Sequence, residues 1–384
     1  MTIRPLWLQR IEQAWKKRSI TWLSGVRRVG KTTISRMIEN SHYFNCDLPS
    51  VVRRLTDPES FFEPFEEKAI LIFDEIHRVA DPSGLLKIAA DEHPHLRVLA
   101  TGSSTLAATK KFRDSLTGRK HLLYLPPVLW QECMDVFSIK DLDHRLLQGG
   151  LPEALLSEQN DPSFYSEWID SFYARDIQEL FNIRNRGAFL KLLRLLLCQS
   201  GGLIDYTNLA KLSDLSRPTV QVHLEAMRIA HAIFLLSPFH GGARREITQR
   251  PKCYAFDTGF VAFTNGWEIL RDTDRGPLWE HLVLDTLRTF FIPSQIFYWR
   301  DKSGHEIDFV LKDKGGRVHA VECKVNASHF DAKTLQYFRS HYPEGDNYVI
   351  TPFLKESYSL THGIVKVNYC SPSNCLLFES SVNI

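Results

Sequence analysis

A glycine-rich segment near the N-terminus has the residue types and spacing of a phosphate-binding loop. It reads Gly25-Val26-Arg27-Arg28-Val29-Gly30-Lys31-Thr32 and fits the pattern G-x-x-x-x-G-K-[ST]. In this pattern the glycines let backbone N–H groups face a β-phosphate, the lysine reaches the β- and γ-phosphates, and the threonine hydroxyl binds Mg²⁺. An apolar run at 20–23 precedes the loop and a helical stretch at 31–40 follows it. This context favours a nucleotide site, including Thr33, over a chance glycine turn.

Two acidic residues follow the apolar run 69–73, which is typical of a strand buried on both faces. A carboxylate at the carboxyl end of a parallel strand lies in the crevice where such sheets bind ligands. We therefore expect Asp74 to hold Mg²⁺ through water and Glu75 to orient the attacking water as a general base. The alternative is a solvated Asp-Glu pair, which the phosphate loop upstream makes less favourable.

Hydroxyl side chains follow the next apolar run, 96–100, in the segment Thr101-Gly102-Ser103-Ser104. The hydroxyls of Thr101 and Ser103 are candidates for contact with the γ-phosphate or the attacking water. The same four residues also form an ordinary turn, so this signal is weak by itself.

A second constellation lies in the last third of the chain, in a predicted hairpin with its turn at 315–316. Residues two apart on a strand share a face, so Glu322 and Lys324 project together, and Asp308 lies on the neighbouring strand. The two carboxylates can bind Mg²⁺ or Mn²⁺, and the lysine can orient an attacking water. The alternative is a surface ion pair between Glu322 and Lys324 beside a solvated Asp308.

The elements that must position these residues follow an α/β pattern. Apolar runs at 20–23, 43–46, 69–73, 96–100 and 121–125 alternate with helical stretches, which predicts a parallel sheet flanked by helices.

The middle region predicts a helix-turn-helix over 205–224, with Ser216 as an N-cap. We expect the exposed side of its second helix to carry Arg217, Thr219, Gln221 and His223. Flanking strands near 232–236 and 253–256 predict a winged helix whose wing contains Arg244 and Arg245. A basic wing suits DNA phosphates, but winged helices are also packing or dimerisation modules.

Composition limits the classes of protein that remain. The 384 residues include 47 Lys plus Arg and 45 Asp plus Glu, so the net charge is +2 and a nucleic-acid site must be a local patch. Seven cysteines without a C-x-x-C pair disfavour a disulfide scaffold and a zinc ribbon, and favour a cytoplasmic location. No stretch reaches the roughly 20 apolar residues of a membrane span, so we expect no membrane association.

The phosphate loop, the D-E strand, the T-G-S-S strand end and Ser115-Leu116-Thr117-Gly118-Arg119 resemble prokaryotic AAA+ ATPases with a C-terminal domain of unknown function. The segments 149–153, 173–177 and 254–259 are similar to the same group. The resemblance implies ATP or ADP as ligand, Mg²⁺ as cofactor and a homo-oligomer. It also implies an arginine finger for the neighbouring subunit, with Arg119 and Arg113 as candidates.

The trio of Asp308, Glu322 and Lys324 resembles the PD-(D/E)xK nuclease signature. Those nucleases often carry an acidic residue on a preceding helix, and Glu280 is placed for that role. His281 and Glu306 are secondary candidates.

Four segments are therefore predicted: an AAA+ P-loop ATPase domain at 1–127, a helical lid at 128–184, a winged helix at 185–250 and a nuclease-like domain at 251–384. We expect an ATP-hydrolysing protein that acts on or with DNA, with a C-terminal domain that binds or cuts nucleic acid. The alternative is a nucleotide-dependent regulator whose nuclease-like domain serves interaction without cutting.

Overall fold

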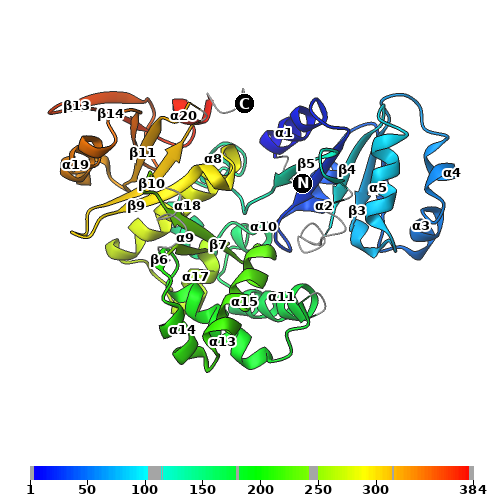
Figure 1. Ribbon diagram of the computed structural model, residues 1–384, viewed down its shortest axis with the longest axis horizontal. Helices are drawn as coiled ribbons and strands as arrows, with labels where there is room; N and C mark the ends of the chain where they lie inside the picture. The colour runs from blue at the N-terminus through cyan, green and yellow to red at the C-terminus, as the bar shows by residue number, and fades with distance from the viewer. Residues whose placement is uncertain are drawn as a thin grey trace. The chain divides into compact units, whose positions relative to one another are not determined.

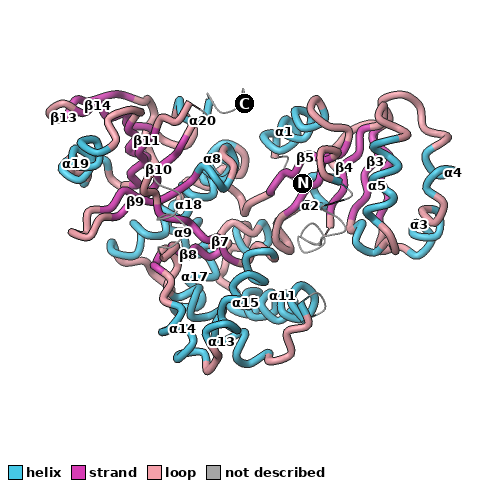
Figure 2. Tube along the Cα trace, in the orientation of Figure 1, coloured by secondary structure: helices cyan, strands magenta, loops and turns pink. Residues whose placement is uncertain are grey.

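A computed structural model describes residues 4–102, 114, 116–178, 181–241, 250–313 and 315–379. The chain forms two compact units (Figures 1 and 2). Unit 1 comprises Met1–Pro126, Glu167–Arg184 and Ile229–Ala232, and unit 2 comprises Pro127–Ser166, Asn185–Arg228 and Ile233–Ile384. Six residues named in the sequence-based hypotheses lie outside the described residues: Ser103, Ser104, Arg113, Ser115, Arg244 and Arg245.

Unit 1 is built around a five-stranded sheet in the order β2-β3-β4-β1-β5. Its strands are β1 (Ile20–Ser24), β2 (Ser41–Asn45), β3 (Ile70–Asp74), β4 (Arg97–Thr101) and β5 (Lys120–Tyr124). Every neighbouring pair is parallel, which confirms the predicted α/β class. Strand β1, which lies between β4 and β5, is buried along its whole length, because helices cover the sheet and leave its apolar residues no solvent.

Helices connect these strands in the order in which they occur along the chain. They are α1 (Pro5–Trp15), α2 (Lys31–Arg36), α3 (Pro49–Arg54), α4 (Pro58–Phe62), η1 (Ile76–Arg78) and α5 (Pro82–Asp91). Unit 1 also takes the end of α11 (Pro162–Phe172) and the π-helix η2 (Tyr173–Gln178) that continues it. Since all five strands run the same way, their carboxyl ends form one edge, and the phosphate loop and Asp74 both lie there.

Unit 2 contains a nine-stranded mixed sheet in the order β13-β14-β12-β11-β10-β9-β7-β8-β6. The strands are β6 (Gly202–Leu203), β7 (Ile233–Pro238), β8 (Lys252–Ala255), β9 (Ile296–Arg300), β10 (Glu306–Lys312), β11 (Val318–Cys323), β12 (Asn347–Ile350), β13 (Tyr358–His362) and β14 (Val365–Cys370). The predicted hairpin is confirmed, because β10 and β11 pair antiparallel on either side of the turn at 315–316.

The helices of unit 2 fall into an early and a late group. The early group is α8 (Trp130–Asp135), α9 (Leu142–Gln148), α10 (Pro152–Leu155), α13 (Arg186–Cys198), α14 (Tyr206–Ser213) and α15 (Arg217–Ile229). The late group is α17 (Thr258–Asn265), α18 (Asp272–Phe290), η3 (Pro293–Gln295), η4 (Ala327–His329), α19 (Lys333–His341) and α20 (Leu376–Glu379). The predicted N-cap of α15 is confirmed, since Ser216 Oγ accepts the Thr219 N–H at 3.2 Å.

One prediction for α15 is wrong. His223 is buried, 5% exposed, and its ring packs against Phe189 with 5.4 Å between ring centroids. The apolar face of α15 turns toward α13 and includes this residue, whereas Arg217 and Gln221 are exposed.

The nine-stranded sheet crosses the predicted border at residue 250. Strands β6 and β7 lie before this border and β8 lies after it, yet β8 pairs with both of them. Strand β7 also pairs with β9 in parallel through Ser237 and Pro238. The unit border also runs through the predicted lid 128–184, because α11 divides after Ser166. The four predicted segments stay a prediction, and the sheet shows that the last two share one hydrogen-bonded framework.

Two short segments from the sequence analysis, 149–153 and 254–259, meet in unit 2. The buried carboxylate of Asp257 accepts the Gly150 N–H at 2.6 Å and the Gly259 N–H at 2.8 Å. Gly149 has φ 75°, and a Cβ there would lie 1.9 Å from Asp257 Oδ1. These glycines are therefore required for the carboxylate to reach two backbone donors, and the contact fixes the end of α9 against the start of α17.

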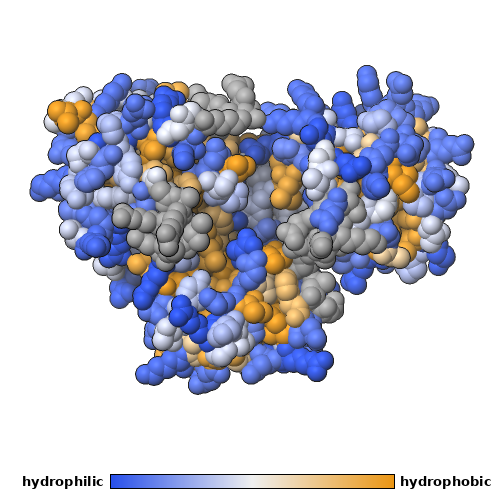
Figure 3. All heavy atoms as spheres, in the orientation of Figure 1, coloured by the Kyte–Doolittle hydropathy of each residue, from blue (hydrophilic) through white to orange (hydrophobic). Residues whose placement is uncertain are grey.

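The visible face of the molecule is mostly hydrophilic (Figure 3). Leu360 and Ile364, which are 49% and 97% exposed, belong to the β13–β14 hairpin of unit 2. Among the described residues, no helix combines the length and apolar character that a membrane span requires.

Candidate functional site

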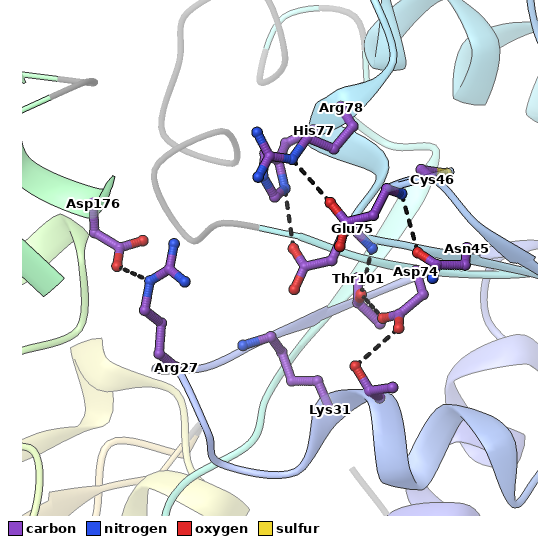
Figure 4. Close-up of polar contacts among 12 residues, drawn as sticks. Arg27, Lys31, Asn45, Cys46, Asp74, Glu75, His77, Arg78, Thr101 and Asp176 are labelled. Atoms are coloured by element: carbon purple, nitrogen blue, oxygen red, sulfur yellow. Dashed lines mark hydrogen bonds and ion pairs between the residues drawn. The ribbon is translucent and has the colours of Figure 1, made fainter. Parts of the chain in front are cut away.

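The phosphate loop links β1 to α2, as the sequence predicts. Gly30 begins α2 with φ 102°, a conformation that a residue with a side chain rarely adopts. Lys31 Nζ donates hydrogen bonds to the carbonyl oxygens of Gly25 and Val26, each at 2.9 Å. The ammonium group therefore lies over the loop and faces the space that Figure 4 shows between Arg27 and Glu75.

Asp74 is the centre of a hydroxyl cluster at the end of β3. It is 3% exposed, and its Oδ2 accepts the hydroxyls of Thr32 at 2.8 Å and Tyr43 at 2.5 Å. Its Oδ1 accepts the Thr101 hydroxyl at 2.5 Å. The structure thus brings together three predicted residues and adds Tyr43. Burial and the contact with Asp74 raise the pKa of Tyr43 to about 12, so its hydroxyl stays a hydrogen-bond donor. The signal for Tyr43 in the sequence was only its place on the strand beside β3.

Glu75 follows Asp74 in the left-handed conformation, φ 55° and ψ 42°, which is uncommon for a residue with a side chain and recurs at functional sites. Its N–H donates to Thr101 Oγ1 at 3.1 Å, and its carboxylate lies 3.1 Å from His77 Nδ1. Burial alone would raise the pKa of Glu75, but the His77 hydrogen bond and the charge of Lys31 lower it below its ordinary value. Glu75 is therefore a carboxylate near neutral pH.

Arg27 of the phosphate loop is held at two points by the α11–η2 segment of unit 1. Its side chain forms an ion pair with Asp176 on η2, and its carbonyl oxygen accepts the Trp168 indole N–H at 3.1 Å. Figure 4 shows the guanidinium between Asp176 and Lys31. Asp176 lies in the segment 173–177, but the sequence does not indicate that it belongs to this site, because no local pattern joins residues 149 positions apart.

Arg119, the predicted finger, lies just before β5 and pairs with Asp91 at the end of α5. The two hydrogen bonds measure 2.6 and 3.0 Å. Both residues lie at the amino ends of the parallel strands, whereas the phosphate loop is at the carboxyl ends. A five-residue strand spans about 17 Å, so Arg119 is remote from the nucleotide site of its own chain.

The predicted trio in unit 2 converges. Lys324 Nζ donates to Glu322 Oε2 at 2.7 Å and lies 3.6 Å from Asp308 Oδ2. Asp308 Oδ2 also accepts the Cys323 N–H at 2.7 Å, which fixes the carboxylate against β11. Because β10 and β11 are adjacent, hairpin register places these side chains together, as the spacing predicts.

A second lysine, Lys252, which no motif in the sequence indicates, bridges two further carboxylates and lies within electrostatic range of Asp308. Lys252 on β8 pairs with Glu280 on α18 at 3.0 Å and with Glu306 on β10 at 2.5 Å. The Tyr254 hydroxyl donates to the same oxygen of Glu280. Burial alone would lower the pKa of Lys252, whereas Glu280 and Glu306 raise it, so it stays charged. The sequence pattern predicts the strand near 253–256 as a flank of the wing, so it gives no sign that Lys252 belongs to this cluster.

Negative groups outnumber positive ones in this cluster. Four carboxylates face the ammonium groups of Lys252 and Lys324 and the guanidinium of Arg300, which lies 3.5 Å from Glu306 Oε2. Burial and the charge of Asp308 raise the pKa of both Glu280 and Glu322. Among the described residues, the structure shows no group of three or more His, Cys, Asp or Glu arranged to hold a metal ion, since lysines lie between the carboxylates.

Comparison with known proteins adds family information to this geometry. Residues 17–134 match a family described as the AAA domain. Residues 139–269 and 275–370 match two domains of unknown function, DUF8612 and DUF4143. An uncharacterized protein of Mycobacterium tuberculosis, Rv2008c, is 27% identical over 327 residues, which cover 82% of this chain and 72% of that protein.

The solved structures that match this chain include the Walker-type ATPase paby2304 of Pyrococcus abyssi. It is 16% identical with a TM-score of 0.46, over 69% of this chain and 96% of that chain. A RuvB variant of Thermotoga maritima is 15% identical with a TM-score of 0.32, over 70% of this chain and 96% of that chain. Because these TM-scores are below 0.5, the solved structures do not enter the classification. The family match and the phosphate loop at the end of β1 identify residues 17–134 as an AAA-type, nucleotide-binding ATPase domain.

Proposed function

We propose that unit 1 binds ATP with Mg²⁺ and hydrolyses it. The observation that supports this most is the contact of the Thr32 hydroxyl with Asp74, at 2.8 Å and directly beside Lys31. A hydroxyl and a carboxylate are oxygen donors of the kind Mg²⁺ prefers, so Thr32 and Asp74 are the residues that would hold it. The metal, when bound, supplies charge neutralisation on the phosphates.

The residues of the chain have separate tasks in this proposal. Lys31 leaves the carbonyl oxygens of Gly25 and Val26 and donates to the β- and γ-phosphates. Glu75 accepts a proton from the attacking water, while Thr101 fixes Glu75 through its backbone N–H. The Ser103 role predicted from sequence lies outside the described residues.

Replacing Lys31 by alanine tests nucleotide binding. We expect the Kd for MgATP to rise by about 10- to 100-fold, because one charged hydrogen-bond donor to the phosphates is lost. Calorimetric titration of the variant measures this. Lys87→Ala on α5 removes a similar charge away from the site and should bind like wild type. Equal affinity for wild type and Lys31→Ala would contradict the proposal.

Arg119 lies at the edge of the sheet opposite its own nucleotide site, so it can act as a finger only on another copy. We therefore propose a homo-oligomer in which Arg119 leaves Asp91 and reaches the phosphates of a neighbour.

DNA is the proposed macromolecular partner. The order α13, β6, α14, α15, β7 and β8 follows the winged-helix order of helices and strands, and Arg217 and Gln221 of α15 are exposed. Replacing both Arg244 and Arg245 by alanine should weaken binding to all DNA sequences alike and lower the salt slope by up to about two units, because two phosphate contacts are lost. Gel shifts at several salt concentrations measure this, and an unchanged slope would place the contact elsewhere.

A second candidate function, metal-dependent cleavage of nucleic acid, is favoured by the convergence of Asp308, Glu322 and Lys324 at the β10–β11 hairpin. A divalent cation held by Asp308 and Glu322 would balance the excess negative charge of the cluster. The non-cleaving alternative, a nucleotide-dependent regulator, is favoured by the two lysines, which already pair with the carboxylates. Cleavage assays on the wild type and on the variants Asp308→Ala and Lys324→Ala separate these two functions.

A further inference from the structure

The ion pair of Arg27 with Asp176 lies beside Lys31 of the phosphate loop. Arg27 is two residues after Gly25, and in Figure 4 its guanidinium, the Lys31 ammonium and the Glu75 carboxylate surround one space. The charges of Lys31 and Arg27 both lower the pKa of Glu75, so each of the two cations lies within electrostatic range of this carboxylate.

Both cations of this space are satisfied by protein acceptors. Lys31 donates to two loop carbonyls, and Arg27 pairs with Asp176. Phosphate oxygens are acceptors of the same kind, so a nucleotide bound in this space would compete for these donors. Binding must therefore exchange protein acceptors for phosphate oxygens, and the exchange costs most where the acceptor left behind is charged and buried.

Asp176 is such an acceptor. Its side chain is 10% exposed, against 31% for Arg27. Burial raises its pKa, and the charges of Arg27 and Lys31 counteract that rise. It belongs to η2, and π-helical turns recur at functional sites. The preceding helix α11 is fixed to the loop by the hydrogen bond from the Trp168 indole N–H to the Arg27 carbonyl, so the segment that carries Asp176 is held beside Arg27.

We propose that Asp176 competes with the γ-phosphate for Arg27, so that the Asp176–Arg27 pair determines how well unit 1 distinguishes ATP from ADP. This rests on the proposed ATP site. In the nucleotide-free state Arg27 is bound to Asp176. When ATP binds, Arg27 turns to the γ-phosphate, and Asp176 with η2 is released. ADP has no γ-phosphate and leaves the pair intact.

Replacing Asp176 by asparagine keeps the shape of the side chain and removes its charge. We expect the Kd for a nonhydrolysable MgATP analogue to fall by about tenfold, because Arg27 no longer has to leave a buried carboxylate. The Kd for MgADP should change by less than about twofold, which is below the effect of one charged hydrogen bond. Glu167→Gln, an exposed carboxylate on the same segment, is the matched control and should leave both affinities unchanged.

The variant Arg27→Met tests whether Asp176 acts through Arg27. It should lose most of the preference for the ATP analogue over ADP, and adding Asp176→Asn to it should have no further effect, as a double-mutant cycle requires. If Asp176 had a purely structural role, Asp176→Asn would instead weaken the binding of both nucleotides together and lower the melting temperature.

The outcomes separate this inference from the proposed function. If wild type binds neither nucleotide, the ATP site itself is wrong. If wild type binds both and Asp176→Asn leaves the ratio of the two Kd values unchanged, only the competition is overturned. Should Asp176→Asn fail to fold, Arg27→Met with an unchanged ratio overturns it in the same way.

Discussion

Replacing Glu75 by glutamine should lower the rate of ATP turnover by about 100- to 10,000-fold while MgATP still binds. Glutamine keeps the size of the side chain, but its amide cannot accept the proton of the attacking water. Glu75 is a carboxylate near neutral pH because the His77 hydrogen bond and the Lys31 charge counteract its burial. Phosphate release in single-turnover and steady-state assays measures the effect.

The matched control is Glu63→Gln, an exposed glutamate of unit 1, which should hydrolyse ATP at the wild-type rate. The Glu75→Gln protein should also bind the ATP analogue as wild type does, because the loop and Lys31 are intact. A Glu75→Gln protein with full turnover would show that another group accepts the proton.

Replacing Asp308 by alanine should abolish divalent-metal binding in unit 2 and any cleavage of nucleic acid. Asp308 is positioned by the Cys323 N–H at 2.7 Å and faces Lys324, so its removal takes away an oxygen ligand that no nearby side chain replaces in position. Lys324→Ala should retain the metal and lose cutting by about 100-fold or more, since the assisting cation is gone. Calorimetry with Mn²⁺ and cleavage assays on single-stranded, duplex and branched DNA and on RNA measure both effects.

Two controls accompany these variants. Asp331→Asn removes an exposed carboxylate of unit 2, 67% exposed at its side chain, and should bind metal and cut like wild type. ATP hydrolysis should stay intact in the Asp308 and Lys324 variants, because the ATPase residues belong to unit 1. If wild type cuts none of the substrates and binds no Mn²⁺ at Asp308, the regulator function replaces the nuclease function.

Local patterns predicted those parts of the molecule that local chemistry determines. The phosphate loop needs glycines at fixed positions, and β3 needs an apolar run with a carboxylate at its end, so both were visible in the sequence. The trio in unit 2 was visible because strand alternation places Glu322 and Lys324 on one face and a short turn places Asp308 beside them.

Contacts between distant segments could not be predicted in this way. Lys252 reaches Glu280 and Glu306 because β8 joins the same sheet as β10, and nothing in the residues around 252 shows that pairing. Asp176 lies beside Arg27 because α11 and η2, about 149 positions later in the chain, pack next to the phosphate loop. The burial of His223 was missed for a related reason, since the side of α15 that packs against Phe189 depends on where α13 lies.

The pairing of β7 with β9 limits how this protein can be divided or recombined. A fragment that begins at residue 251 would keep β8 and β9 but lose β6 and β7, which pair with them, and unpaired strand edges invite aggregation. It would also keep Lys252 on a strand with no partner to hold it near Glu280. The residues on both sides of 250 must therefore be inherited and expressed together, and exchange of the C-terminal region between related proteins would succeed only if β6, β7 and β8 were transferred with it.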